Sequence, residues 1–143
     1  TGYIFISCEQ GLRLTSFGPA FMAFKLSIIG EGVNYDPHYG GTGFREESDF
    51  QMQMAKRGCS LIYDSRFFAY HVNLMYGGNR SINDLYKRIY WKARNHTYFI
   101  KKHSNGLKKF VYLLAGGVIL AIYGGLVVLP SVLKGLRDGL TQL

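Results

Sequence analysis

The longest apolar stretch of the sequence lies in the last third of the chain. Residues 110–133, FVYLLAGGVILAIYGGLVVLPSVL, comprise 24 residues without a single charged side chain. A helix of this length extends roughly 36 Å, whereas the hydrocarbon core of a bilayer is about 30 Å thick. The pattern therefore predicts a membrane helix over 110–133. The alternative is a helix buried in a protein core.

Features within and around this stretch predict how it sits in a membrane. Pro130 is expected to end or kink the helix. Small residues recur at the four-residue spacing that lets helices approach closely, namely Gly117, Ala121 and Gly125. Four lysines at 101, 102, 108 and 109 precede the stretch and only Lys134 and Arg137 follow it closely, which places the N-terminal part in the cytoplasm. The tail, 134–143, alternates apolar and polar residues and is expected to lie along the membrane interface.

A second helix is predicted over 80–109. Ser81 is its expected N-cap, and Asp84 follows three residues later, as in a capping box. Its apolar positions fall on one side: Ile82, Leu85, Tyr86, Ile89 and Ala93. Basic residues recur every seven positions at Lys87, Arg94 and Lys101, which predicts a single basic stripe. Such a helix either lies in the lipid headgroup layer or packs on its own domain with a solvated basic face.

The first half, residues 1–79, predicts shorter elements in an α/β order. A strand is expected at 3–7, and residues 19–29 are expected to form a strand and a first helical turn. A glycine-rich loop follows over 30–43. The run DFQMQMAKRG predicts a helix that ends at Gly58. Strands are then expected on either side of a turn at Asp64 and Ser65 in SLIYDSRFFAYHV.

Charge and composition narrow the possible partners. The 143 residues carry a net charge of +8, of which 1–79 contribute −1 and 80–143 contribute +9. The second half is therefore expected to face an anionic partner, and the apolar stretch favours phospholipid. Nucleic acid is not expected, because no RNA-binding motif is present. Two cysteines, Cys8 and Cys59, do not make a disulfide scaffold and suit a reducing compartment, and the first residues do not resemble a signal peptide.

The densest acidic cluster follows the glycine-rich loop HYGGTG and comprises Glu46, Glu47 and Asp49. Carboxylates at a helix N-terminus are stabilised by its free N–H groups, so capping alone is one explanation. The other is a general base beside a loop that admits substrate. His71 closes the predicted strand FFAYH, where it either has a structural role or lies at a ligand site.

Together these motifs resemble the C-terminal part of the catalytic domain of family 2 glycosyltransferases. The similarity covers about residues 15–103 and rests on GPAFMAFK, GGTGFREESDFQMQMAKRG, LIYDSR and the terminal histidine, in the family's order. It implies half of an α/β, Rossmann-like GT-A domain over 1–79 on the acceptor side. The implied activity is inverting transfer of a sugar from a nucleotide-sugar donor to a glycan or lipid-linked acceptor at a membrane.

The resemblance also implies roles for individual residues. Glu46 and Glu47 match the family's acidic pair, so Glu47 is the expected base that deprotonates the acceptor hydroxyl, with Asp49 as its rival. His71 matches a ligand of the divalent metal, Mg²⁺ or Mn²⁺. The substrate pocket would be shaped by Gly40, Gly41, Thr42 and Gly43.

One part of the family pattern is absent from the sequence. No D-x-D motif, which binds the metal and the nucleotide in the family's first half, occurs in these residues. The isolated chain is therefore expected to be inactive unless further residues or a second chain supply that half. The alternative is a non-catalytic, membrane-anchored interaction module on a degraded transferase scaffold.

Overall fold

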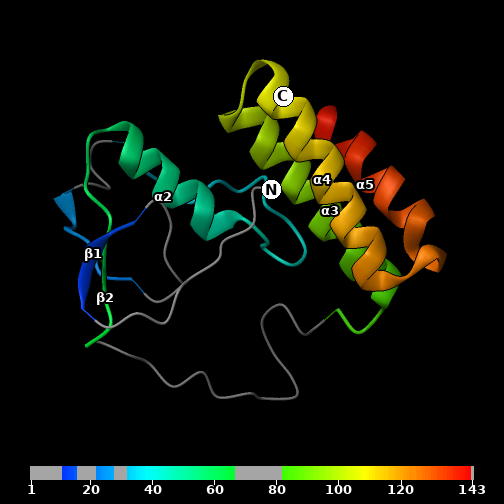
Figure 1. Cartoon of the computed structure of the whole chain (residues 1–143), viewed down its shortest axis with the longest axis horizontal. Coiled ribbons are helices and arrows are strands. Elements are labelled where there is room, and N and C mark those ends of the chain that lie inside the picture. Colours follow the sequence, from blue (N-terminus) through cyan, green and yellow to red (C-terminus); the bar gives the residue numbers. More distant parts are fainter. Residues whose placement is uncertain (1–10, 16–21, 28–31, 67–81, 143) are drawn as a thin grey trace. The chain divides into compact units, whose positions relative to one another are not determined.

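The computed structural model of the protein describes residues 11–15, 22–27, 32–66 and 82–142. These residues fall into two compact units. The helical unit contains 37–45 and the described residues from 82 onward, and the mixed unit contains the described residues of 11–36 and 46–66. Figure 1 labels the elements of both units, and each unit is considered by itself.

Helix α3 (Leu85–His103) is the central element of the helical unit. Asp84 caps it, because its carboxylate accepts hydrogen bonds from two backbone N–H groups of the first turn. The predicted start is therefore wrong: Asp84 is the cap itself and not an acid one turn inside a helix that begins at Ser81.

The predicted apolar span over 110–133 is divided between three elements. Helix α4 (Gly106–Gly124) begins four residues earlier than predicted and ends before Gly125, whose φ of 76° breaks the helix. A 3-10 turn, η2 (Leu126–Val128), leads into α5 (Leu129–Leu140). Pro130 does not end a helix but lies in the first turn of α5, where no N–H group is needed.

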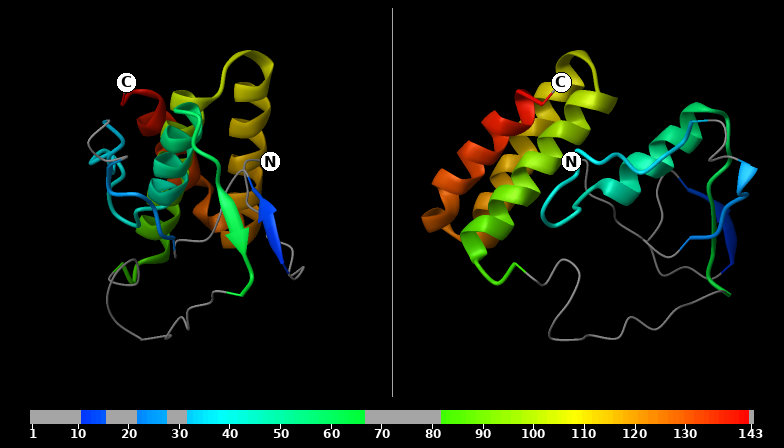
Figure 2. Two further views of the ribbon diagram at one scale, coloured as in Figure 1. Left: turned by 90° about the vertical axis from the view of Figure 1, so that its left-hand side faces the viewer. Right: turned by 180° about the vertical axis from the view of Figure 1, so that it is seen from behind.

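Helices α3, α4 and α5 pack side by side, as both views of Figure 2 show. Tyr90 pairs with Asp138, and Arg94 pairs with Gln142, so α5 runs in the same direction as α3. The core between them is apolar and consists of Ile89, Ala93, Leu120, Val128 and Val132. Burial of such side chains stabilises the unit by about 1.5–3 kcal/mol each.

Glycines allow α5 to lie very close to α3. A Cβ atom added at Gly135 would lie 2.6 Å from the carbonyl oxygen of Tyr90, and one added at Gly139 would lie 2.5 Å from that of Arg94. The predicted small-residue face on α4 makes no backbone contact as close as these at Gly117, because a Cβ atom added there would meet only Leu136 Cδ1, at 3.3 Å. The closest helix packing therefore uses the Gly-x-x-x-Gly spacing of α5.

The predicted basic stripe on α3 does not face solvent as a whole. All residues of 93–100 are buried, and Arg94 is only 7% exposed. Lys101 donates a hydrogen bond to the carbonyl oxygen of Leu140, whereas Lys87 is exposed. The structure thus agrees with the alternative in which this helix packs within its own domain.

The mixed unit contains a short antiparallel pair, β1 (Leu12–Leu14) and β2 (Ile62–Asp64), and helix α2 (Glu46–Lys56). The predicted helix and the predicted strand before Asp64 are confirmed, and Gly58 follows the helix with a φ of 81°. β1 forms where no element was predicted. The apolar core of this unit consists of Val33, Phe50 and Met54.

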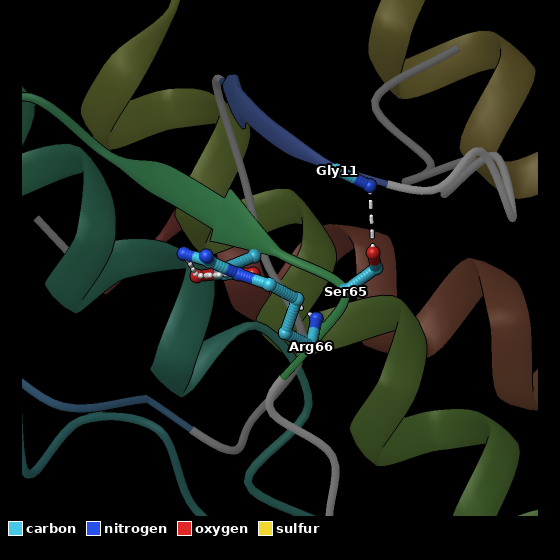
Figure 3. A network of polar contacts seen from close by, with 4 residues as sticks. Gly11, Ser65 and Arg66 are labelled. Atoms are coloured by element: carbon cyan, nitrogen blue, oxygen red, sulfur yellow. Dashed lines mark hydrogen bonds and ion pairs between the residues drawn. The ribbon is translucent and has the colours of Figure 1, made fainter.

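Polar contacts at the end of the strand pair are shown in Figure 3. The Gly11 N–H donates to the Ser65 hydroxyl at 2.7 Å, and the Ser65 N–H donates to the Gly11 carbonyl at 3.2 Å. Arg66 forms an ion pair with Asp64 at 2.7 Å, and hydrogen bonds from Arg66 lower the pKa of Asp64. The predicted turn is shifted by one residue, because Asp64 ends β2 and the turn residues are Ser65 and Arg66.

Other predictions for the first half have different outcomes. Residues 22–25 form neither strand nor helix, so the strand predicted over 19–29 is wrong at these positions. The strands predicted at 3–7 and after Arg66 lie outside the described residues. For that reason the predicted half of a GT-A domain stays a prediction.

Candidate functional site

The segment 37–45, which contains the predicted substrate-pocket residues 40–43, is held against α3 by two buried polar side chains. Arg94 Nη1 donates to the carbonyl oxygen of His38 at 2.6 Å, and Asn95 Nδ2 donates to the carbonyl oxygen of Gly40 at 2.9 Å. Arg94 also donates to Asn95 Oδ1 at 2.9 Å and to Gln142 Oε1 at 2.7 Å. Arg94 therefore links the loop, α3 and the residue that follows α5. Buried backbone oxygens in a loop need such partners.

Trp91 explains why glycines occur in this loop. A Cβ atom added at Gly41 would lie 2.2 Å from Trp91 Cγ, and one added at Gly40 would lie 2.9 Å from Trp91 Cζ3. Gly41 also has a φ of 62°, a conformation that side chains other than glycine rarely adopt. The Trp91 ring thus packs on bare backbone.

Aromatic rings fix the rest of the loop. The ring of Tyr98 lies 5.7 Å from that of His38 and 5.2 Å from that of Tyr39. The Arg45 guanidinium lies 5.1 Å from the Phe44 ring centroid and 5.3 Å from that of Phe99. These contacts bury Arg45 to 5% exposure although its φ of 76° is unusual for a residue with a side chain.

His96 lies under the other side of α3, against α4. Its Nε2 donates to the carbonyl oxygen of Tyr112 at 3.3 Å, and Gly116 leaves room for its ring. Burial, reinforced by the nearby positive charge of Arg45, lowers the pKa of His96 to about 4. The histidine is therefore neutral at physiological pH and serves packing between the helices.

The predicted acidic residues lie in the first turn of α2, in the mixed unit. Glu46 and Glu47 are partly exposed. Partial burial and the negative charge of Glu47 raise the pKa of Glu46. Burial, followed by the charges of Glu47 and Glu46, also raises the pKa of Tyr35, whose ring stacks on that of Phe50 at 4.7 Å. Both glutamates thus act electrostatically on one phenol.

Asp49 differs from the two glutamates in its surroundings. It is fully buried, and Gln53 Nε2 donates to its carboxylate at 2.6 Å. Gln53 also donates to the carbonyl oxygen of Asn34 at 2.9 Å and accepts from its N–H at 3.3 Å. Asp49 and Gln53 together hold the preceding loop onto α2.

The remaining predicted site residues have these positions. Gly40, Gly41, Thr42 and Gly43 belong to the loop on α3, and Thr42 is 2% exposed, so its side chain is not open to solvent. The chain passes from this loop into α2 between Arg45 and Glu46.

The predicted metal ligand, His71, lies outside the described residues. Within 11–15, 22–27, 32–66 and 82–142, no three His, Cys, Asp or Glu side chains gather as ligands of a metal.

The residues that hold the loop, Trp91, Arg94 and Asn95, had no predicted site role. Arg94 was assigned to a solvated basic stripe because it recurs seven residues after Lys87. A signal against that assignment exists in the sequence: Arg94 follows Tyr90 and precedes Tyr98 by four residues each, so it shares a helix face with two aromatic rings. Asn95 carries no comparable signal.

Helix α4 is long and apolar enough to cross a membrane. Most of its side chains are not covered by the rest of the protein. This agrees with the predicted association of the chain with a membrane, although the apolar helix has other bounds than predicted.

Comparisons with models of known protein families, with curated proteins and with solved structures found no match to this chain. The glycosyltransferase assignment and its Mg²⁺ or Mn²⁺ cofactor therefore stay predictions from the sequence motifs.

Proposed function

We propose that this chain is the acceptor-side part of a membrane-associated, inverting glycosyltransferase. The observation that carries the proposal is the partly exposed Glu47 in the first turn of α2. A general base must be reachable by the hydroxyl that it deprotonates, and the partial exposure of Glu47 meets that requirement.

In this proposal Glu47 removes the proton from the acceptor hydroxyl as its oxygen attacks the anomeric carbon of the donor. The bond from that carbon to the nucleotide diphosphate breaks, and the configuration is inverted. A divalent cation, when bound, would offset charge on the departing diphosphate. The proposal assigns no further step to the cation, and His71 enters only through the family resemblance.

The surroundings of the acids favour Glu47 over Asp49 as the base. Asp49 is fully buried and already accepts a hydrogen bond from Gln53, so it is not reachable by an acceptor from solvent. Glu46 is the neighbouring acid in the same turn, and the family resemblance assigns the base to Glu47, the second residue of the acidic pair.

The proposed location is the cytoplasmic face of a membrane. Lysines are concentrated before and at the start of α4, and the anionic lipids of the cytoplasmic leaflet attract basic segments of this kind. The nucleotide-binding half must come from further residues or from a second chain. Donor and acceptor are a nucleotide sugar and a glycan or lipid-linked hydroxyl.

A second candidate is a non-catalytic, membrane-anchored interaction module. It is favoured by the packing of Gly40 and Gly41 under Trp91, and by the hydrogen bond from Asn95 to the Gly40 carbonyl. These contacts explain the glycines of the loop without any substrate.

The test is Glu47→Gln in a preparation that also contains the nucleotide-binding half. Sugar transfer should fall by about a hundredfold or more, because a general base typically contributes at least that much. Glu46→Gln is the matched control and should retain most of the activity. Unchanged turnover in Glu47→Gln would favour the interaction module. Loss of activity only in a correctly folded Asp49→Asn variant would assign the base to Asp49.

A further inference from the structure

The outer side of α4 is an apolar stripe that runs along the whole helix. Its members recur every three or four residues and are exposed by 48–77%: Leu107, Phe110, Val111, Leu114, Val118 and Ile122. The stripe continues onto the turn after α4, where Leu126 is 83% exposed and Val127 62%. Soluble proteins seldom leave so large an apolar patch in water, so this side of α4 has a partner.

The charges around the stripe identify the partner as anionic. Between Asp84 and Asp138 the sequence contains ten Lys and Arg residues and no Asp or Glu. Two of these, Lys108 and Lys109, lie in the first turn of α4 beside the stripe. A second copy of the chain would bring these like charges together at the interface, whereas anionic phospholipid headgroups would neutralise them.

The packing of α4 argues against a simple membrane crossing. Helices α3 and α5 lie along α4 and carry charges partway along their length, at Lys92, Lys134 and Arg137. The Lys92 ammonium lies 5.1 Å from the Tyr123 ring of α4, and that of Lys134 lies 5.6 Å from the Tyr90 ring. If α4 crossed the bilayer within this unit, these charges would enter the hydrocarbon, which is costly.

A flat orientation avoids that cost. A helix of 19 residues, about 28 Å long, can lie in the plane of the membrane with its apolar side below the headgroups. The flexible stems of the flanking lysines then let their charges stay in the headgroup layer.

We infer that the helical unit binds one face of an anionic phospholipid membrane, with the outer stripe of α4 and the turn 126–128 inserted into one leaflet, and that it does not cross the bilayer. The inference rests on the membrane association within the proposed function and not on its chemistry. The experiments below do not measure sugar transfer, so they can fail independently of the transferase proposal.

The first experiment measures co-sedimentation of the purified chain with vesicles of phosphatidylcholine, with and without phosphatidylglycerol. Binding should be much tighter when phosphatidylglycerol is present and should weaken with salt. Lys108→Gln with Lys109→Gln should weaken it roughly thirty-fold, as expected for two lysines at an anionic surface. The matched control, Lys56→Gln with Arg57→Gln, removes two charges from exposed residues of the mixed unit and should leave binding unchanged.

The apolar stripe is tested in the same assay. Leu114→Ser with Val118→Ser should abolish vesicle binding, while circular dichroism shows the helix content retained. Leu12→Ser with Leu14→Ser, which changes two exposed leucines of β1, should bind like the unchanged protein. Absence of vesicle binding by the unchanged chain, or a soluble oligomer that covers the stripe, would overturn the inference.

The second experiment distinguishes lying on the membrane from crossing it. Single cysteines are placed at Asn83 and at Asn105, exposed residues just before and just after α3, with Cys8 and Cys59 changed to serine. The chain is added to preformed sealed vesicles and treated with a maleimide that does not cross membranes. Both positions should react without detergent. If one position reacts only after detergent is added, the unit crosses the bilayer and the inference is wrong.

Discussion

The two units of this protein use buried polar groups and glycines in different ways. In the helical unit, Arg94, Asn95, His96 and Thr97 are buried in succession on α3, and two of them hold the loop 37–45. In the mixed unit, the core is a small apolar cluster, fewer of the described polar side chains are buried, namely Ser48, Asp49 and Gln51 of α2, and the polar links between β1 and β2 lie at the surface. The helical unit therefore depends more strongly on specific polar geometry, because buried polar groups must all find partners.

The glycines show the same difference. Gly135 and Gly139 have helical backbones and are needed because α3 leaves no space for a side chain. Gly58 has open space around it and is favoured because of its φ of 81°. Gly135 and Gly139 thus serve packing density, whereas Gly58 serves turn geometry, and substitutions should separate these roles.

The largest effect is expected from Gly135→Ala combined with Gly139→Ala. The added methyl groups would lie within 2.5–2.7 Å of α3 atoms, namely two backbone carbonyl oxygens and two Cβ atoms, so α5 must move away. The helical unit should lose about 4 kcal/mol of stability, measured by denaturant unfolding or by hydrogen exchange within α3. Gly117→Ala is the control and should cost much less, because it meets only the end of the flexible Leu136 side chain. Equal effects in both variants would contradict the close α3–α5 packing.

A smaller effect is expected from acidification. The pKa of His96 is lowered by burial from 6.5 to about 4, so the unfolded chain takes up a proton between these values while the folded chain does not. The free energy of unfolding therefore has its full value above pH 6.5. It decreases as the pH falls towards 4, by about 3 kcal/mol in total.

A substitution can test whether His96 causes this pH dependence. His96→Gln retains a donor for the Tyr112 carbonyl but cannot ionise, so the stability of the helical unit should lose this part of its pH dependence. His38→Gln, at an exposed loop position, is the control. The same slope in His96→Gln as in the unchanged protein would show that another group is responsible.

The smallest effect is expected from a matched pair of amide substitutions. Asn95→Ala removes the hydrogen bond to the Gly40 carbonyl, which keeps the Gly43 N–H at 3.3 Å, and it removes one acceptor of Arg94 Nη1. It should cost about 2 kcal/mol, with faster hydrogen exchange confined to 37–45 and α3. Gln53→Ala, which removes the hydrogen bonds of Gln53 to Asn34 and Asp49, should cost about 1 kcal/mol and affect only the mixed unit, because Gln53 is less buried than Asn95. Exchange that rises in both units after either substitution would contradict their separation.

Local signals in the sequence correctly predicted several elements. The helix α2 with Gly58 behind it, the strand that ends at Asp64, and the apolar character of α4 all depend on residues close in the chain. The candidate acids were also placed correctly in the first turn of α2. Their chemical role stays a prediction, as does that of His71, which lies outside the described residues.

Other features could not be predicted from neighbouring residues. The apolar run 110–133 gives no warning that Gly125 turns the chain and that α5 then returns along α3, because the same residues suit one long helix. The tyrosines four residues before and after Arg94 indicate which helix face it shares, but they do not indicate what it binds. Only the loop carbonyls and Gln142, which come from distant parts of the chain, make it a buried anchor.

The sequence by itself therefore determined the local elements, the excess of positive charge in the second half and the apolar nature of one helix. Each of these follows from propensity, periodicity or composition within a short window. The tertiary structure alone decided that α3 is buried, that two glycines of α5 bring it against α3, and that one side of α4 remains exposed. These facts depend on which distant surfaces meet, and helices with similar patterns can satisfy the same local rules in more than one packing.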